Sequence, residues 1–189
     1  MYRVVIADDE PTIRIYIKEI LQMNNYDVVG DAADGFDAVE ICRREKPDFA
    51  ILDIRMPILD GLEAAKVIKS ESLCGFVLLL TAFSDKSIAA QAKDADVMGY
   101  LVKPIDENSL IPAVEIAVNK YKEIKKLKLE WGKARDALQD RKIIDRAKGV
   151  LIDKKGMNEE DAYQYLRKVA MDKGCTISQI AKIIIQTNR

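Results

Sequence analysis

Three carboxylates that follow predicted strands are the residues best suited to chemistry. Asp8 and Asp9 follow the apolar run VVIA, and Asp53 follows FAIL. In an open parallel sheet the carboxyl ends of the strands form the edge where ligands bind. Because neighbouring strands lie about 4.8 Å apart, these acids can form one cluster. Their mutual repulsion requires a cation, and crowded oxygen ligands favour Mg²⁺.

Two further polar residues are expected at the same edge of the sheet. Thr81 ends the next apolar run and Lys103 follows the last one, so they add a hydroxyl and an ammonium. Metal, hydroxyl and ammonium together can hold an anion beside Asp53, which is the equipment for phosphoryl transfer to a carboxylate. Each residue alone has a plainer interpretation, because acids after strands often cap helices and threonine is common in turns. The five together favour the phosphoryl-transfer site.

These residues must be positioned by the short apolar strands and helical segments that alternate along the first part of the chain. Five strands alternating with five helices predict an α/β fold, a doubly wound parallel sheet covered on both faces. Right-handed crossovers then leave few strand orders. The predicted strands are Val4–Ala7, Val28–Ala32, Phe49–Leu52, Phe76–Leu80 and Tyr100–Val102, and the predicted helices begin near Pro11, Gly35, Gly61, Ser84 and Glu107.

Composition narrows the chemistry further. The 189 residues include no histidine, which excludes histidine catalysis and most catalytic zinc sites, so any phosphohistidine must belong to another protein. The three cysteines form no C-x-x-C pair and are expected to be free thiols of a cytoplasmic protein. No apolar run approaches the roughly 20 residues of a membrane helix, so no membrane partner is expected.

Charge divides the chain into two parts. Residues 1–120 contain 21 acidic and 13 basic residues, a net charge of −8, whereas residues 121–189 contain 10 acidic and 17 basic residues, a net charge of +7. This asymmetry predicts two domains, of which the basic one faces a polyanion. Charge counts alone are equally consistent with a solvated, lysine-rich helical surface.

A long helix is predicted to connect the two parts over residues 110–138. Its apolar residues recur at spacings of three and four, a heptad-like seam with one stammer. The pattern favours a coiled-coil linker that can pair two copies of the chain, and the alternative is a long helix that packs on its own chain. The seam residues are Leu110, Val114, Ala117, Tyr121, Ile124, Leu127, Trp131, Ala134 and Leu138.

The basic part predicts a small all-α domain of three helices over residues 135–189. The first helix is expected over residues 138–155, and the segments KKGMNEED and KGCTIS separate it from the other two. Asn158 is expected to cap the second helix, and Thr176 or Ser178 the third. Three such short helices make a small core, which argues for support from the linker.

Over roughly residues 1–120 the chain resembles the receiver domains of response regulators, through the motifs VVIADDE, FAILDIRMPILDG, LLLTA and YLVKPI. The resemblance implies a flavodoxin-like strand order, 2-1-3-4-5, and phosphorylation of Asp53. It also implies that Mg²⁺ is bound by Asp8, Asp9, Asp53 and the backbone carbonyl of Arg55, with Asp9 the more direct of the first two. The other implied roles are phosphate contacts for Thr81 and Lys103, a cis peptide bond before Pro104, and a switch aromatic, Tyr100, that turns inward.

Over about residues 135–189 the chain resembles the ANTAR domain, the RNA-binding module of transcription antitermination regulators. The resemblance rests on IIDRAKGVLIDKKGMNEEDAYQYLRKVAMDKGCTISQIAKIII, with Ile152 where the family usually has methionine. It is nearest to the ethanolamine-utilisation antiterminators. It implies binding of tandem RNA hairpins in a leader transcript, which prevents terminator formation. Hairpin loops suit such recognition because their unstacked bases expose edges and faces.

The residues expected to contact RNA are basic or aromatic, because these bind phosphates or stack on bases. Tyr163 has an alternative role in helix packing, and Arg167 an alternative ion pair with Asp161 or Glu160. Ala147, Ala162, Ala170 and Ala181 either allow close helix packing or leave a shallow surface that a base can approach, and packing is the favoured interpretation. The expected RNA contacts are Arg146, Lys148, Lys154, Lys155, Tyr163, Arg167 and Lys168.

Together the resemblances imply a response regulator that catalyses only its own phosphorylation and dephosphorylation. A sensor histidine kinase would supply the phosphoryl group, and a homodimer formed on phosphorylation would place two basic domains on two hairpins. The alternative is a DNA-binding transcriptional response regulator, the commonest kind, or a receiver whose tail binds protein. A phospho-aspartyl hydrolase would need a second Asp where this chain has Arg55.

Overall fold

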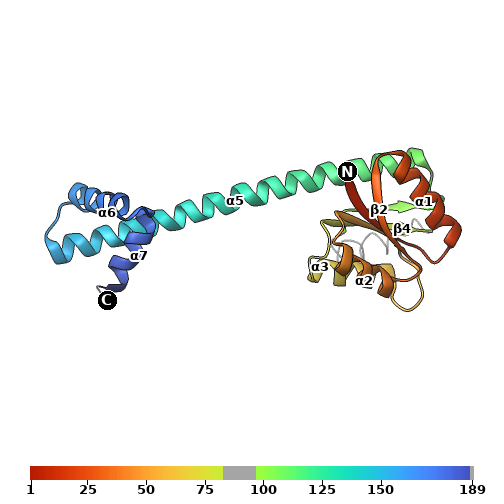
Figure 1. The fold of residues 1–189 in the computed structure, drawn as a ribbon, viewed down its shortest axis with the longest axis horizontal. Coiled ribbons are helices and arrows are strands. Elements are labelled where there is room, and N and C mark those ends of the chain that lie inside the picture. The colour runs from red at the N-terminus through yellow and green to blue at the C-terminus, as the bar shows by residue number, and fades with distance from the viewer. Residues whose placement is uncertain (83–96, 188–189) are drawn as a thin grey trace. The chain divides into compact units, whose positions relative to one another are not determined.

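The computed structural model describes residues 1–82 and 97–187, so the helix expected near Ser84 lies outside the described residues (Figure 1). The chain divides into two compact units, Met1–Ile124 and Lys125–Arg189. Within the described ranges, no helix combines the length and the apolar character that crossing a bilayer requires. In chain order the elements are β1 (Tyr2–Ala7), α1 (Pro11–Met23), β2 (Tyr26–Ala32), α2 (Gly35–Glu45), β3 (Phe49–Asp53), α3 (Gly61–Ser70), β4 (Phe76–Thr81), β5 (Gly99–Val102), α5 (Glu107–Lys155), α6 (Glu159–Lys173) and α7 (Ile177–Thr187).

The five strands form one parallel sheet in the order β2-β1-β3-β4-β5, which confirms the expected topology. In the central register Val4 pairs with Phe49, and Phe49 pairs with Phe76. The chain moves outward from β1 to β2 and then returns to β3, so the order reverses between β1 and β3. The carboxyl ends of these two strands therefore border the crevice where α/β proteins bind ligands.

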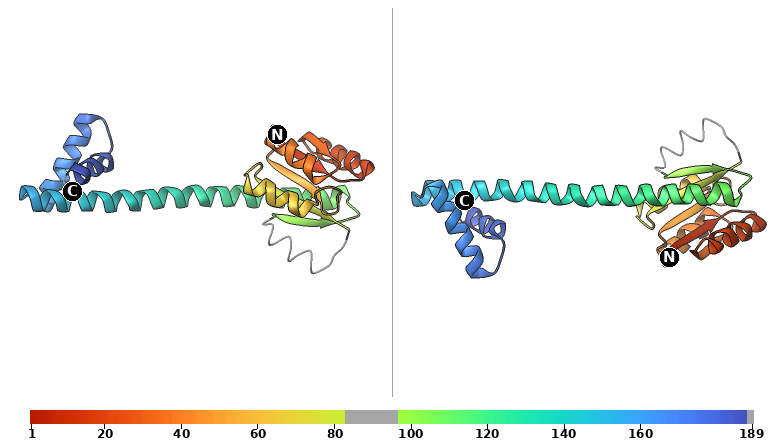
Figure 2. Two further views of the ribbon diagram at one scale, coloured as in Figure 1. Left: turned by 90° about the horizontal axis from the view of Figure 1, so that it is seen from below. Right: turned by 90° about the horizontal axis from the view of Figure 1, so that it is seen from above.

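Both faces of the sheet are covered, which explains why the central strands are apolar throughout. Successive side chains of a strand point to opposite faces. On β3, Ala50 and Leu52 pack with α2 and α3, whereas Phe49 and Ile51 pack with α1 and the first part of α5. The start of α5 lies beside α1 on this second face, as Figure 2 shows in green and red.

The first half of the heptad-like seam belongs to the core of the first unit. Leu110, Val114 and Ala117 are buried because α5 closes the second face of the sheet. Tyr121, one turn further along, packs against Phe76 with ring centroids 5.6 Å apart. For this half the coiled-coil prediction was wrong, and the alternative, packing on its own chain, is correct.

The second half of the seam is exposed. Trp131 is 75% exposed, and Leu127 and Leu138 are each 57% exposed. Leu127, Trp131 and Ala134 line a shallow apolar groove on the surface of α5. Exposed apolar side chains at this spacing are typical of a surface that pairs with a partner, so the coiled-coil prediction remains for this half.

The second unit is built from the end of α5 together with α6 and α7. The helix expected over residues 138–155 is continuous with the linker, because the single Gly132 lowers helix stability without ending the helix. Leu151 from α5, Leu166 from α6 and Ile180 from α7 are buried together in the core of this unit. α5 thus supplies the support that three short helices need.

Two side-chain caps begin the short helices of this unit. The Oδ1 atom of Asn158 accepts a hydrogen bond of 2.8 Å from the backbone N–H of Asp161, which confirms the expected cap of α6. Thr176 Oγ1 accepts one of 3.3 Å from the N–H of Gln179, so Thr176 caps α7. Ser178 lies buried inside that helix and is not the cap.

The three cysteines are free, as expected. Burial raises the pKa of the Cys42 and Cys74 thiols to about 12. Because the thiolate is the reactive form, these two side chains act as packing residues rather than nucleophiles.

Candidate functional site

Two buried carboxylates and one ammonium meet at the carboxyl edge of the sheet. The Nζ atom of Lys103 lies 2.7 Å from Oδ2 of Asp8 and 2.9 Å from Oδ1 of Asp53. Asp8 and Asp53 are 0% and 4% exposed. A single positive charge thus bridges two buried negative charges. When both carboxylates are ionised, the cluster has an excess of negative charge that a further cation can neutralise.

The strand ends place these side chains. Asp53 is the last residue of β3, and the backbone N–H of Arg55 donates a hydrogen bond of 2.7 Å to its Oδ2 atom. Thr81, the last residue of β4, is buried, and its carbonyl oxygen accepts a hydrogen bond of 2.7 Å from the N–H of Lys103. The peptide bond between Lys103 and Pro104 is cis, as the resemblance implied.

The acidic loop after β1 has the chemistry of a divalent-cation site. Carboxylate oxygens of Asp8, Asp9 and Glu10 lie within 4.8 Å of one another. The buried Asp8 Oδ2 atom makes no hydrogen bond of acceptable geometry, although the Lys103 ammonium is close to it. An under-coordinated buried carboxylate beside a second exposed one fits a hard cation such as Mg²⁺. Glu10 was not singled out from the sequence, and its position in the motif VVIADDE was the signal.

The pKa of Asp53 is raised above the ordinary Asp value. Burial is the main cause and the nearby Asp8 adds to it, while Lys103 and the Arg55 N–H oppose the shift. For Lys103, burial lowers the pKa, but the close contacts with the negative charges of Asp53 and Asp8 outweigh it and the net shift is upward. The ammonium therefore keeps its charge, and Asp53 takes up a proton at a higher pH than an ordinary Asp does.

This shift predicts how cation binding depends on pH. Only the ionised form of Asp53 attracts a cation, so its raised pKa should weaken Mg²⁺ binding at a higher pH than an ordinary Asp would. We expect Mg²⁺ affinity to fall as the pH decreases and proton release to accompany binding. Isothermal titration calorimetry in buffers of different ionisation enthalpy measures both. An affinity that stays constant down to the ordinary titration range of Asp would contradict the prediction.

The cluster opens onto a surface cavity of about 230 Å³. This volume accommodates a small anion next to Asp53. Tyr100, the expected switch aromatic, is 46% exposed and therefore does not occupy a buried position in this structure. The cavity is lined by Asp9, Glu10, Asp53, Ile54, Arg55, Thr81, Ala82 and Lys103.

Gly61, at the start of α3, lies against the backbone of Asp53, and this close approach requires a residue without a side chain. A Cβ atom there would collide with the carbonyl oxygen of Asp53 and lie 2.9 Å from its carbonyl carbon. Gly61→Ala should therefore destabilise the fold by about 1–3 kcal/mol, because the backbone that carries Asp53 must shift to make room. Gly132→Ala is the matched control, because nothing lies within 4 Å of its added Cβ. Thermal melting of both variants tests this, and two variants with the same stability would refute the clash.

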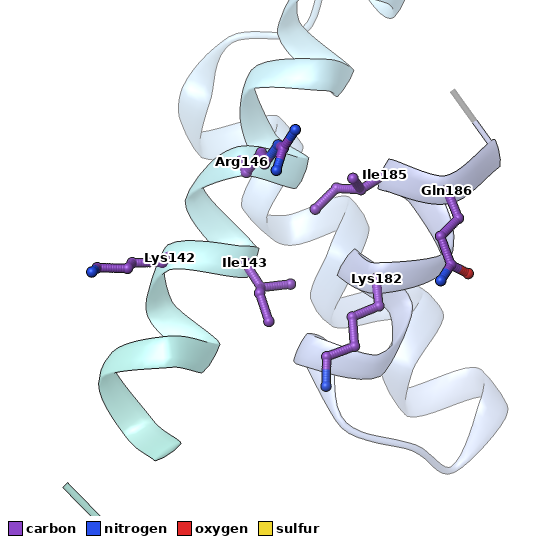
Figure 3. Close-up of a pocket in the computed structure, with 6 residues that line it drawn as sticks. All are labelled: Lys142, Ile143, Arg146, Lys182, Ile185 and Gln186. Atoms are coloured by element: carbon purple, nitrogen blue, oxygen red, sulfur yellow. The ribbon is translucent and has the colours of Figure 1, made fainter. Parts of the chain in front are cut away.

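The basic residues of the second unit lie on different sides of it. The Nζ atom of Lys148 lies 2.8 Å from Oδ1 of Asp145, on the same helix, and 2.8 Å from Oε1 of Glu159 at the start of α6. Its charge is already compensated, and its pKa is raised by these two carboxylates. Arg146, by contrast, lines a cleft between α5 and α7 (Figure 3).

The other expected RNA contacts vary in their availability. Lys155 lies over the Tyr165 ring, with Nζ 4.6 Å from the ring centroid. Tyr163 is 38% exposed, and Arg167 and Lys168 are also exposed. Within residues 1–82 and 97–187, no ion pair joins Arg167 to either of the acids considered for it. Lys154 is exposed as well.

The four alanines of the expected motif are at most 3% exposed and belong to the core of the second unit. The packing interpretation is therefore correct, because side chains this buried leave no surface for a base. They are Ala147, Ala162, Ala170 and Ala181.

A parallel sheet of this order, with two acids and a lysine at its carboxyl edge, defines a response-regulator receiver. Residues 4–115 match the family described as "response regulator receiver domain", and residues 132–185 match the "ANTAR domain". The chain belongs to the response regulators that combine these two domains.

Three relatives illustrate the match. "Transcriptional regulatory protein PdtaR" of Mycobacterium tuberculosis is 42% identical over 98% of this chain and 90% of its own length. "Chemotaxis protein CheY" of Bacillus subtilis is 32% identical over 62% of this chain and 98% of its own. The receiver-domain structure of NarL from M. tuberculosis superposes with a TM-score of 0.58 at 34% identity, over 64% of this chain and 96% of that chain.

Proposed function

We propose that this response regulator is switched by phosphorylation of Asp53 and then binds tandem RNA hairpins in leader transcripts, preventing transcription termination. The observation that carries the proposal is the contact of Lys103 with both Asp8 and Asp53, on the same chain as an ANTAR domain. The Lys103 cluster would supply the switch, and the ANTAR domain would supply the RNA-binding output.

A sensor histidine kinase would supply the phosphoryl group. An oxygen of the ionised Asp53 attacks phosphorus, the P–N bond to histidine breaks, and the imidazole leaves with the bonding electron pair. Lys103 balances charge on the incoming phosphoryl oxygens, and the Thr81 hydroxyl contacts them. Asp8, Asp9, Asp53 and the Arg55 carbonyl would hold Mg²⁺, which would neutralise the crowded negative charge when bound.

The switch would act through elements that already contact the site. Once Lys103 and Thr81 engage the phosphoryl group, Tyr100 would leave its exposed position and turn inward. That change alters the face formed by β5 and the start of α5. The exposed seam of α5 would then pair with that of a second copy, and two ANTAR domains would engage two hairpins with a raised effective concentration.

In this proposal the chain catalyses only its own phosphorylation and dephosphorylation. A phosphatase that uses an aspartyl nucleophile needs an acid two residues further on. Arg55 occupies that position here, and its guanidinium keeps its proton at neutral pH, so it cannot act as the acid.

A pool of tandem hairpins with randomised loops tests the function. The pool is passed over the full-length chain with Mg²⁺, with and without acetyl phosphate, and retained RNA is quantified beside the protein's mass in solution. We expect selective retention of hairpin pairs and a doubled mass after phosphorylation. Equal retention and an unchanged mass would overturn the switch, and preferential retention of a duplex DNA competitor at matched salt would overturn the RNA output.

A further inference from the structure

A cleft of about 300 Å³ lies between the end of α5 and α7. Figure 3 shows Ile143 and Ile185 pointing toward one another across the gap between these helices. The cleft volume is at the lower end of the range for small-molecule sites, about 300–1,000 Å³. Its size suits a single nucleotide-sized group rather than a large ligand.

Three basic residues line the cleft, Lys142 and Arg146 from α5 and Lys182 from α7. The Lys142 ammonium extends away from α7 at the edge of the cleft (Figure 3). All three are exposed. In the part of the chain that the structure describes, none of them forms an ion pair with a carboxylate. Lys148, on the side of α5 that faces α6, instead has two acidic partners at 2.8 Å. The uncompensated positive charge of this unit therefore includes a cluster at the α5–α7 cleft.

The combination of charge and apolar surface identifies one kind of occupant. Cations alone would suit any anion, but Ile143 and Ile185 also offer an apolar surface to the flat face of a base. The Gln186 amide at the rim can both donate to and accept from a base edge. Unstacked loop nucleotides of RNA present a phosphate, an exposed face and a free edge together.

We propose that the α5–α7 cleft binds one unstacked loop nucleotide of the RNA hairpin. The base would lie against Ile143 and Ile185, and its flanking phosphates would contact Arg146 and Lys182 within the cleft and Lys142 at its edge. This inference rests on the proposed RNA-binding function and assigns part of the RNA contact to the α5–α7 cleft. Most of the basic residues expected from the sequence lie in α6 or in the part of α5 beyond this cleft, whereas Lys142 and Lys182 were not among them.

The first test removes two cleft charges in the full-length chain as Lys142→Gln/Lys182→Gln. The matched control is Lys125→Gln/Lys133→Gln, which removes two exposed lysines of α5 that lie outside the cleft. Lys133 lies nine residues, about 13 Å, along the helix from Lys142, which exceeds the screening length of about 8 Å at physiological salt. Unchanged thermal melting shows that both variants are folded.

We expect the cleft variant to bind a hairpin pair selected on the wild type about tenfold more weakly. Its salt dependence, the slope of log affinity against log salt, should become shallower by about 0.7 for each lost phosphate contact. The control should keep both values. Wild-type affinity and slope in the cleft variant would overturn the cleft while leaving the RNA function intact. A wild type that binds no hairpin would overturn the RNA function itself.

A second measurement tests the base contact. Each loop nucleotide is made abasic in turn and its effect is measured with the wild type and with Ile185→Ala. One abasic position should weaken wild-type binding and have little further effect in Ile185→Ala, because the two changes remove the same contact. Effects that add at every loop position would show that no base occupies the cleft. An acidic peptide serves as a competitor. If the wild type does not distinguish intact from abasic hairpins but binds this peptide, and Ile185→Ala abolishes peptide binding, the cleft binds protein instead.

Discussion

Asp53→Asn should abolish phosphorylation by acetyl phosphate and remove the effect of acetyl phosphate on RNA binding. The amide has the shape of the carboxylate but lacks its nucleophilic charge. It also leaves Lys103 with Asp8 as its remaining acidic partner at the site. Because Asp53 is buried with a raised pKa, replacing its charge should not destabilise the fold. We therefore expect a folded protein that has lost its response.

Intact-mass spectrometry measures the phosphoryl group directly, and gel shifts with a hairpin pair measure the response. Asp27→Asn is the matched control, because Asp27 is exposed on β2 and is not among the residues that line the cavity beside Asp53. It should behave as the wild type. Phosphorylation of Asp53→Asn at another residue, with an RNA response preserved, would refute the assignment of Asp53.

Leu127→Glu/Trp131→Glu should prevent dimer formation and weaken binding to a hairpin pair by about 10²–10⁴-fold, while binding to a single hairpin remains unchanged. The range is that expected when two linked sites lose their effective concentration. Both side chains are largely exposed in the chain, at 57% and 75%. Their replacement therefore acts on assembly rather than on the folded monomer.

Analytical ultracentrifugation after acetyl phosphate treatment gives the mass, and titrations with one or two hairpins give the affinities. Gln139→Glu is the control, because it adds a charge to an exposed position of α5 that is not part of the seam. It should still form dimers. A double variant that remains dimeric and still prefers paired hairpins would show that the seam does not hold the copies together.

Much of the receiver follows from local patterns in the sequence. Apolar runs such as FAIL and VVIA predict buried strands, and a residue that directly follows a strand must lie at the carboxyl edge of the sheet. This rule anticipated the meeting of Asp8, Asp53 and Lys103, because alternation of strands and helices restricts the topology so strongly. Asn158 and the four buried alanines were also anticipated, since caps and close packing depend on neighbours along a helix.

The tertiary structure decided which faces of the helices are free. A heptad pattern shows that a helix has an apolar stripe, but it does not show what covers that stripe. Here the sheet covers Leu110, Val114 and Ala117, while Trp131 stays exposed. The same holds for charge. Lys148 is neutralised by Glu159 from the next helix, and Lys182 completes the α5–α7 cleft, because contacts between separate helices set the environment of a side chain. Sequence thus determined that Asp8, Asp53 and Lys103 meet at the carboxyl edge of the sheet. Packing determined which of the basic and apolar residues remain available to partners.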